Sequence, residues 1–103
     1  MIIVHSKNNI PVRLTEERWN HIIRRHPEIE NMREQFLETI VSPEIVLEGD
    51  YGELLAVKRF RKTPLTEKYL VVAYREISTE DGFVLTGYLT NKPSERRKVI
   101  WKR

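Results

Sequence analysis

The chain has 103 residues, no cysteine and a formal net charge of +3, from 18 lysines and arginines against 15 acidic residues. This length fits one domain, residues 1–103, and the lack of cysteine excludes disulfides, thiolate metal sites and thiol nucleophiles. With 40% hydrophobic residues and no run near the roughly 20 apolar residues of a membrane helix, the sequence predicts a cytoplasmic globular protein without a membrane partner. The mild positive charge permits an anionic partner without requiring one.

Two short apolar segments, residues 2–5 and 10–14, flank the polar sequence S-K-N-N and predict a hairpin or an edge strand. The next stretch, residues 15–28, reads T-E-E-R-W-N-H-I-I-R-R-H-P-E and predicts a short amphipathic helix. Thr15 is suited to the N-cap, and Pro27 disfavours helical geometry at the residue before it, where the helix should end.

This predicted helix has two distinct faces, because residues advance by about 100° around its axis. One face carries the apolar residues and one histidine: Trp19, Ile22, Ile23 and His26. The opposite face is basic and carries Arg18, His21 and Arg25. We expect the first face to enter the core and the second to remain available for chemistry or binding.

A second helix is expected at residues 29–41, where apolar residues recur every three or four positions until a Ser-Pro pair. Strand patterns follow at residues 45–48, 54–60, 69–77 and 83–90, with a short edge strand or strap at 99–101. The sequence therefore predicts an α+β fold, with two N-terminal helices packed on one face of an antiparallel sheet of about four strands.

Alternation along residues 83–90 divides the side chains between the two faces of the predicted sheet. The free face should carry Val84, Thr86, Tyr88 and Thr90, of which the last three form a row of hydroxyls, and the core face should carry Phe83, Leu85, Gly87 and Leu89. Glycine is costly inside a strand unless the backbone must be approached closely or must bulge there, and a helix that packs across Gly87 would be a sufficient reason. Against this core face we expect burial of Trp19, Ile22, Ile23, Met32, Phe36 and Ile40.

The polar residues are those of a metal-free ribonuclease. Such an enzyme needs a base for the 2′-hydroxyl, an acid for the leaving oxygen, and cations over the charge that develops on phosphorus. Imidazole suits both proton roles, because its unperturbed pKa of about 6.5 lies near working pH. The candidate catalytic residues are His21, His26, Arg25, Thr86, Tyr88 and Thr90.

Other interpretations of the same residues stay open. His26 is equally well read as a core histidine, because it shares the Trp19 face. His21 can be an exposed helical residue, and the arginines and strand hydroxyls can simply face water. No metal or other cofactor is expected, since H-x-x-x-x-H lacks the four-residue spacing that places two ligands on one helix face.

Several motifs resemble the phage- and mobile-element-associated nucleases of the barnase, EndoU, colicin and RelE-like (BECR) group. They are W-N-H-I-I-R-R-H-P-E, E-T-I-V-S-P-E-I-V, K-Y-L-V-V-A-Y, G-F-V-L-T-G-Y-L-T and the terminal V-I-W. The resemblance covers nearly the whole chain after residue 14, and its distinctive parts are the R-H-P-E helix end and the T-G-Y-L-T strand.

This resemblance implies a metal-independent ribonuclease, often a toxin or phage-defence protein that a neutralising antitoxin or immunity protein would bind. It implies helix histidines at His21 and His26, a basic residue at Arg25, and strand hydroxyls at Thr86, Tyr88 and Thr90. The strand cation falls on Lys58 or Arg59, and with Arg24 these are the expected substrate-binding residues.

We therefore expect a ribonuclease that cleaves RNA by acid/base transphosphorylation without a cofactor. The alternative is a non-catalytic RNA-binding or protein-interaction module on the same fold. Its basic surface would consist of Arg18, Arg24, Arg25, Lys58, Arg59, Arg61 and Lys62.

Overall fold

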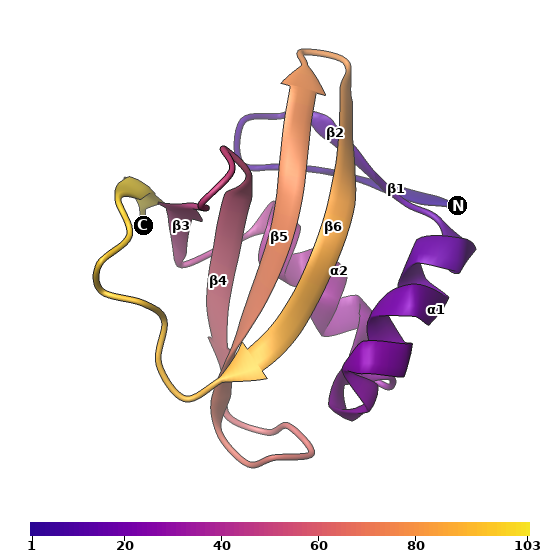
Figure 1. The fold of residues 1–103 in the computed structure, drawn as a ribbon, viewed down its shortest axis with the longest axis vertical. Helices are drawn as coiled ribbons and strands as arrows, with labels where there is room; N and C mark the ends of the chain where they lie inside the picture. Colours follow the sequence, from indigo (N-terminus) through magenta and orange to yellow (C-terminus); the bar gives the residue numbers. More distant parts are fainter.

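A single twisted sheet collects strands from the whole chain in the computed structural model, which describes residues 1–103 (Figure 1). The strands are β1 (Ile2–His5), β2 (Pro11–Leu14), β3 (Ile45–Glu48), β4 (Leu54–Phe60), β5 (Lys68–Ser78), β6 (Asp81–Thr90) and β7 (Val99–Lys102). They lie in the order β1-β2-β6-β5-β4-β3-β7. The helices are α1 (Glu16–Arg25) and α2 (Arg33–Val41), joined through the 3₁₀ turn η1 (Pro27–Ile29).

The prediction of an antiparallel sheet of about four strands is wrong, because seven strands form one mixed sheet. The N-terminal hairpin joins this sheet through a parallel pairing of β2 with β6, where Arg13 lies opposite Phe83. At the other end, β7 pairs antiparallel with β3. The segments were recognisable from local patterns, but these pairings connect distant parts of the chain and leave no local signal.

Local signals fix the ends of α1 as predicted. The Thr15 hydroxyl accepts a hydrogen bond from the Arg18 backbone N–H at 3.0 Å, which caps the helix. At the other end, His26 leaves helical geometry directly before Pro27, with φ −131° and ψ 69°. The second helix begins later than the predicted residue 29, because the chain first forms η1 and another turn.

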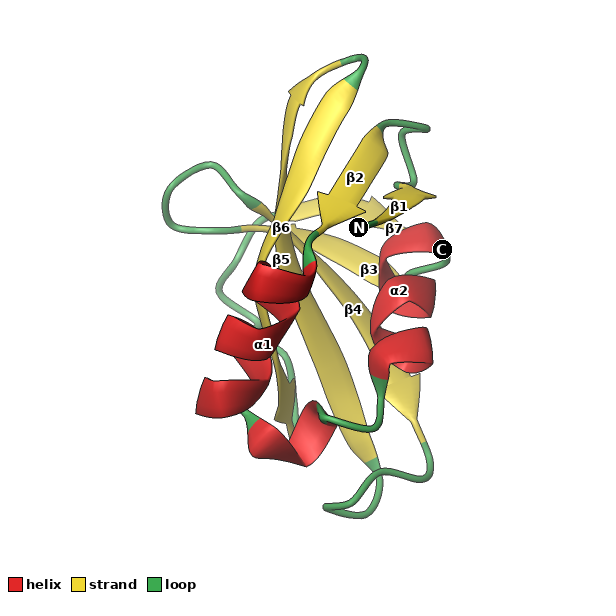
Figure 2. Ribbon diagram, turned by 90° about the vertical axis from the view of Figure 1, so that its right-hand side faces the viewer, coloured by secondary structure: helices red, strands yellow, loops and turns green.

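Both helices cover one face of the sheet (Figure 2). The rings of Trp19 and Phe36 meet edge to face with centroids 5.1 Å apart. Arg33, at the start of α2, donates hydrogen bonds of 3.0 and 2.9 Å to the Glu16 carboxylate, which lowers the pKa of that carboxyl. The predicted burial is confirmed for Trp19, Ile22, Met32, Phe36 and Ile40, whereas Ile23 is half-buried against the core.

Gly87 explains how α2 comes so close to the sheet. A Cβ at this position would lie 2.3 Å from Phe36 Cε2 and 3.1 Å from the Val71 carbonyl oxygen. The Phe36 ring therefore occupies the space that any other residue would need, and the close helix approach predicted at this glycine is confirmed.

A β-bulge changes the predicted alternation along β6. Tyr74 of β5 pairs with Val84, whereas Ala73 pairs with Thr86, so Leu85 is an extra residue. As a result Val84 joins the helix-side core, although alternation placed it in the hydroxyl row. Leu85 instead packs with the apolar residues on the opposite face, which corrects its predicted position.

We call the sheet face opposite the helices the open face. It carries a second apolar cluster of Leu47, Leu55, Val57, Val71 and Ala73, with Ile45, Tyr69, Leu85 and Tyr88 packed against it.

The sheet also curls, and Lys7 in the β1–β2 turn reaches the Trp101 ring of β7, with Nζ 4.7 Å from the ring centroid. This contact links the first hairpin to the last strand.

Replacing Gly87 with alanine should destabilise the fold by ~1–3 kcal/mol, because the new methyl group and the Phe36 ring cannot occupy the same space. Chemical denaturation measures the loss. In a Phe36→Leu background the same substitution should cost less, since the shorter side chain leaves room. An equal cost in both backgrounds would show that the ring is not the obstacle.

Tyr74 is fully buried, and its hydroxyl has no hydrogen-bond partner. Burial, followed by the charge of Glu76, raises the pKa of this phenol. Removing an unpaired buried hydroxyl removes a desolvation penalty, so Tyr74→Phe should leave the stability unchanged or raise it. A loss above about 1 kcal/mol in denaturant melts would reveal a hydrogen bond to this hydroxyl.

Candidate functional site

Helix α1 lies beside β6, along the edge that β6 shares with β2 (Figure 1). Strand β2 pairs with β6 only at Phe83, so the rest of that edge faces the helix. Arg18 Nη1 donates a 3.4 Å hydrogen bond to the carbonyl oxygen of Leu85 on this edge. Arg18 on the polar side of α1 therefore gives the Leu85 carbonyl a hydrogen-bond partner. The C-terminal end of the helix comes near Tyr88 of β6.

His26 lies at the junction of α1 and β6. Its ring centroid is 6.1 Å from that of Tyr88, with the planes tilted by 37°. Its Nδ1 lies 3.5 Å from Oε1 of Glu28, and 32% of the His26 side chain is exposed. The histidine is thus outside the buried core cluster and remains accessible from solvent.

The sequence around Pro27 produces this pairing. Because proline ends α1 and starts the 3₁₀ turn η1, the chain turns back and brings Glu28 beside the imidazole two residues earlier. A carboxylate next to Nδ1 favours the tautomer with its proton on that nitrogen, which leaves Nε2 free to accept a proton. His26 and Glu28 thus have the arrangement of a base and its orienting carboxylate.

The predicted hydroxyls of β6 lie on the open face, where they continue across neighbouring strands. Thr86 pairs with Ala73, Tyr88 with Val71 and Thr90 with Tyr69. Tyr69 in turn pairs with Arg59, so Arg59, Tyr69 and Thr90 form one line across three strands. Of the two strand cations considered, Arg59 is therefore the one on the same face as Tyr88.

The other predicted site residues lie elsewhere. Lys58 points to the helix side, where its Nζ is 2.9 Å from Glu38 Oε2 of α2. His21 and Arg24 line a hollow of about 450 Å³ on α1, together with Thr15, Glu17 and Arg18. Arg25 is the last residue of α1, and its side chain is exposed. The two histidines project from different sides of the helix, because five residues correspond to about 140° of rotation.

Residues 91–98, which we call the strap, connect β6 to β7 along the β4 and β3 side of the sheet (Figure 1). A cavity of about 230 Å³ lies between the strap and the sheet. Its lining comprises Leu47, Leu55, Val57, Val71, Tyr88 and Thr90 from the sheet and Lys92, Pro93, Ser94 and Arg97 from the strap. Tyr88 thus has His26 as one neighbour and this cavity as the other.

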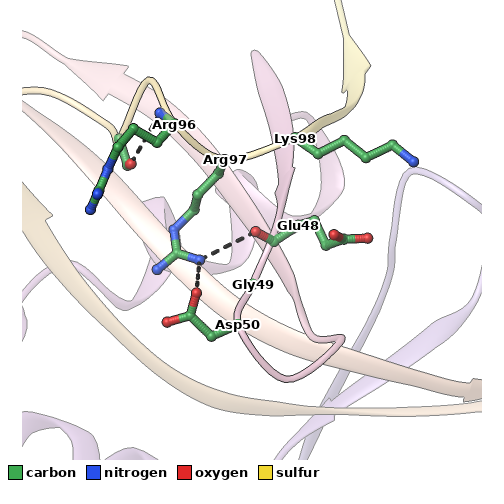
Figure 3. Close-up of a pocket in the computed structure, with 7 residues that line it drawn as sticks. Glu48, Gly49, Asp50, Arg96, Arg97 and Lys98 are labelled. Carbon is green, nitrogen blue, oxygen red and sulfur yellow. Dashed lines mark hydrogen bonds and ion pairs between the residues drawn. The ribbon is translucent and has the colours of Figure 1, made fainter.

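Ion pairs hold the strap. Arg97 Nη1 contacts Asp50 Oδ1 at 2.9 Å and the Glu48 carbonyl oxygen at 3.4 Å (Figure 3). The hydrogen bond to Asp50 raises the pKa of Arg97. Within the strap, Lys92 lies 2.8 Å from Glu95 and lowers the pKa of that carboxyl. The hollow around Arg97, about 610 Å³, is lined by polar residues and glycine and shares Ser94 and Arg97 with the apolar cavity.

Sequence reasoning did not assign roles to Glu28, Tyr69 or Arg97. Glu28 could have been found, since it stands in the quoted R-H-P-E motif two residues after the histidine. Tyr69 and Arg97 had no comparable signal, because strand pairing and the strap bring them to the site from far along the chain.

No three histidine, aspartate or glutamate side chains lie together in a group that could hold a metal ion. None of the helices has the length and apolar character needed to cross a membrane. No protein-family model, curated protein or solved structure gives a significant match to this chain. The function has to be inferred from the side chains described above.

Breaking the ion pair between Arg97 and Asp50 should loosen the strap. In Asp50→Asn and Arg97→Gln we expect faster hydrogen exchange of the amides in residues 91–98, with little change in global unfolding, because exposed ion pairs contribute little to stability. Glu95→Gln is the control, since its partner Lys92 belongs to the strap itself. Equal exchange in all four proteins, including the wild type, would mean that the apolar contacts alone hold the strap.

Proposed function

We propose that this protein is an endoribonuclease that cleaves RNA by transphosphorylation without a cofactor, with His26 and Tyr88 at the reaction centre. The observation that carries the proposal is that His26 lies near both the Glu28 carboxylate and the Tyr88 ring, and that the strand of Tyr88 bears further hydroxyls. The resemblance of the R-H-P-E and T-G-Y-L-T motifs to the BECR nucleases supports the same reaction.

In the proposed reaction, Nε2 of His26 takes the proton from the ribose 2′-hydroxyl while Glu28 orients the ring. The 2′-oxygen then attacks phosphorus, and the bond from phosphorus to the 5′-oxygen breaks. The Tyr88 hydroxyl donates the proton to that leaving oxygen. The products are a 2′,3′-cyclic phosphate and a free 5′-hydroxyl.

Other side chains would stabilise the phosphate during this step. Thr86 can donate a hydrogen bond to its oxygens, and Thr90 can do so in exchange for its 3.2 Å hydrogen bond to the Lys92 carbonyl oxygen. Arg59 and Arg25 can supply positive charge. Arg59 is paired with Glu67 at 3.4 Å in an exposed position, so a phosphate can replace that partner at little cost. His21 and Arg24 would instead contact RNA outside the reaction centre.

A non-catalytic RNA-binding module is the second candidate. Residues 91–103 hold six of the 18 basic residues and one of the 15 acidic ones, so they carry +5, whereas the first 90 residues carry −2. Such a concentrated charge supports binding to a polyanion whether or not cleavage follows. An acidic antitoxin or immunity protein could use the same charges as its docking surface.

The decisive variant is His26→Ala. We expect kcat for RNA cleavage to fall ~10²–10⁴-fold with little change in affinity, because a proton-transfer group acts in the transition state. Glu28→Gln should lower kcat less, since the imidazole remains. Single-turnover cleavage of labelled RNA in the presence of a chelator, with detection of the cyclic phosphate, measures all three proteins.

His21→Ala is the matched control from the same helix, and its kcat should match the wild type. Wild-type cleavage by a folded His26→Ala protein would remove His26 from the reaction centre. Activity that EDTA abolishes and Mg²⁺ or Mn²⁺ restores would replace the acid/base reaction by a metal-assisted one. RNA binding without cleavage by the wild-type protein would favour the second candidate.

A further inference from the structure

The cavity beneath the strap has an apolar floor and a polar rim. On its floor Leu47, Leu55, Val57 and Val71 are only 1–6% exposed, although no helix covers this face. Its volume of about 230 Å³ is below the roughly 300–1,000 Å³ of sites for drug-sized ligands. A space of this size can hold one flat ring system.

Hydrogen-bonding and charged groups surround this apolar floor. Thr90 and Ser94 contribute hydroxyls, and Lys92 and Arg97 contribute cations. Tyr88, an aromatic residue, is also part of the lining. Unstacked RNA bases have apolar faces and polar edges, and proteins bind them by stacking on aromatic side chains while contacting their edges.

The charge around the cavity matches the chemistry of such a ligand. A base in a polynucleotide has a phosphate on each side, and residues 91–103 carry a net charge of +5, whereas the first 90 residues carry −2. The polar hollow beyond Arg97 is lined by Arg96, Arg97 and Lys98 together with Glu48 and Asp50, so cations outnumber acids where a chain would leave the cavity (Figure 3). Asp50 holds Arg97 at this rim and fixes its position.

We propose that the cavity under the strap binds one unstacked base of an RNA chain, next to Tyr88, which also neighbours His26. The inference rests on the proposed function, which supplies RNA as the substrate, and adds a subsite for a base near the scissile phosphate. Because Tyr88 borders both places, a base bound in the cavity would fix the position of the adjacent phosphate at the histidine.

The test fills the cavity from its exposed side. Ser94→Phe should place a ring in the space, and Thr79→Phe on the distant β5–β6 turn is the matched control. The ligands are 2′-O-methyl tetranucleotides, which cannot be cleaved, each with all bases or with one abasic position. Fluorescence anisotropy measures their affinity.

For the wild type and Thr79→Phe, removal of the base at one position should weaken binding about 5- to 150-fold, the usual effect of losing one stacked base. Ser94→Phe should lose this dependence on the base. It should bind every tetranucleotide with the affinity that the wild type shows for the abasic one. A folded Ser94→Phe protein that keeps the wild-type dependence overturns the subsite.

A second measurement keeps the proposal testable if Ser94→Phe fails to fold. In the wild type, methyl resonances of Leu55, Val57 and Val71 should shift on titration with nucleoside monophosphates but not with inorganic phosphate. Unchanged methyl resonances overturn the proposal. A polyaspartate peptide that shifts the same methyl groups and displaces RNA also overturns it, in favour of an acidic protein partner.

Cleavage assays separate this inference from the proposed function. Base-dependent binding without cleavage supports the subsite and rejects the ribonuclease reaction. Cleavage by a protein that binds abasic and complete tetranucleotides equally well supports the reaction and rejects the subsite.

Discussion

The contact between Phe36 and Gly87 sets the geometry on which the candidate site depends. Without a side chain at Gly87, the Phe36 ring rests directly on β6, and its edge contact with Trp19 carries that position on to α1. Helix α1 then lies beside β6 and ends with His26 beside Tyr88. Tyr88 directly follows Gly87 in the strand. The contact with Phe36 and the contact with His26 therefore fall on adjacent residues that face opposite sides of the sheet.

Much of this arrangement could be predicted because its causes are local. Thr15 and Pro27 bound the first helix through capping and proline sterics, which depend only on neighbouring residues. Gly87 indicated a close approach to the strand, which the Phe36 ring of α2 makes. The extent of the sheet could not be predicted in the same way, because the β2–β6 and β3–β7 pairings join residues far apart in sequence.

The errors on β6 have a single physical origin. Period-two alternation assumes a regular ladder, and the extra residue Leu85 interrupts it between Val84 and Thr86. The prediction was right on the C-terminal side of the bulge, where Tyr88 and Thr90 reach the open face, and wrong on the N-terminal side. The candidate site was predictable to the same extent. Glu28 lies in a motif that is visible in the sequence, whereas Arg97 reaches the cavity through a strap whose path depends on the whole sheet.

The parallel pairing of β2 with β6 also bears on how this protein reaches its folded state. Strands β3 to β6 pair with their sequence neighbours and can form as local hairpins, whereas Arg13 must find Phe83 across most of the chain. The entropy of closing a loop rises only slowly with its length, but such non-local contacts slow the search for the native topology. The meander of β3 to β6 can therefore form early and serve as the template on which the N-terminal hairpin docks. Helix α1, which follows β2 directly, would reach its place beside β6 only in that late step.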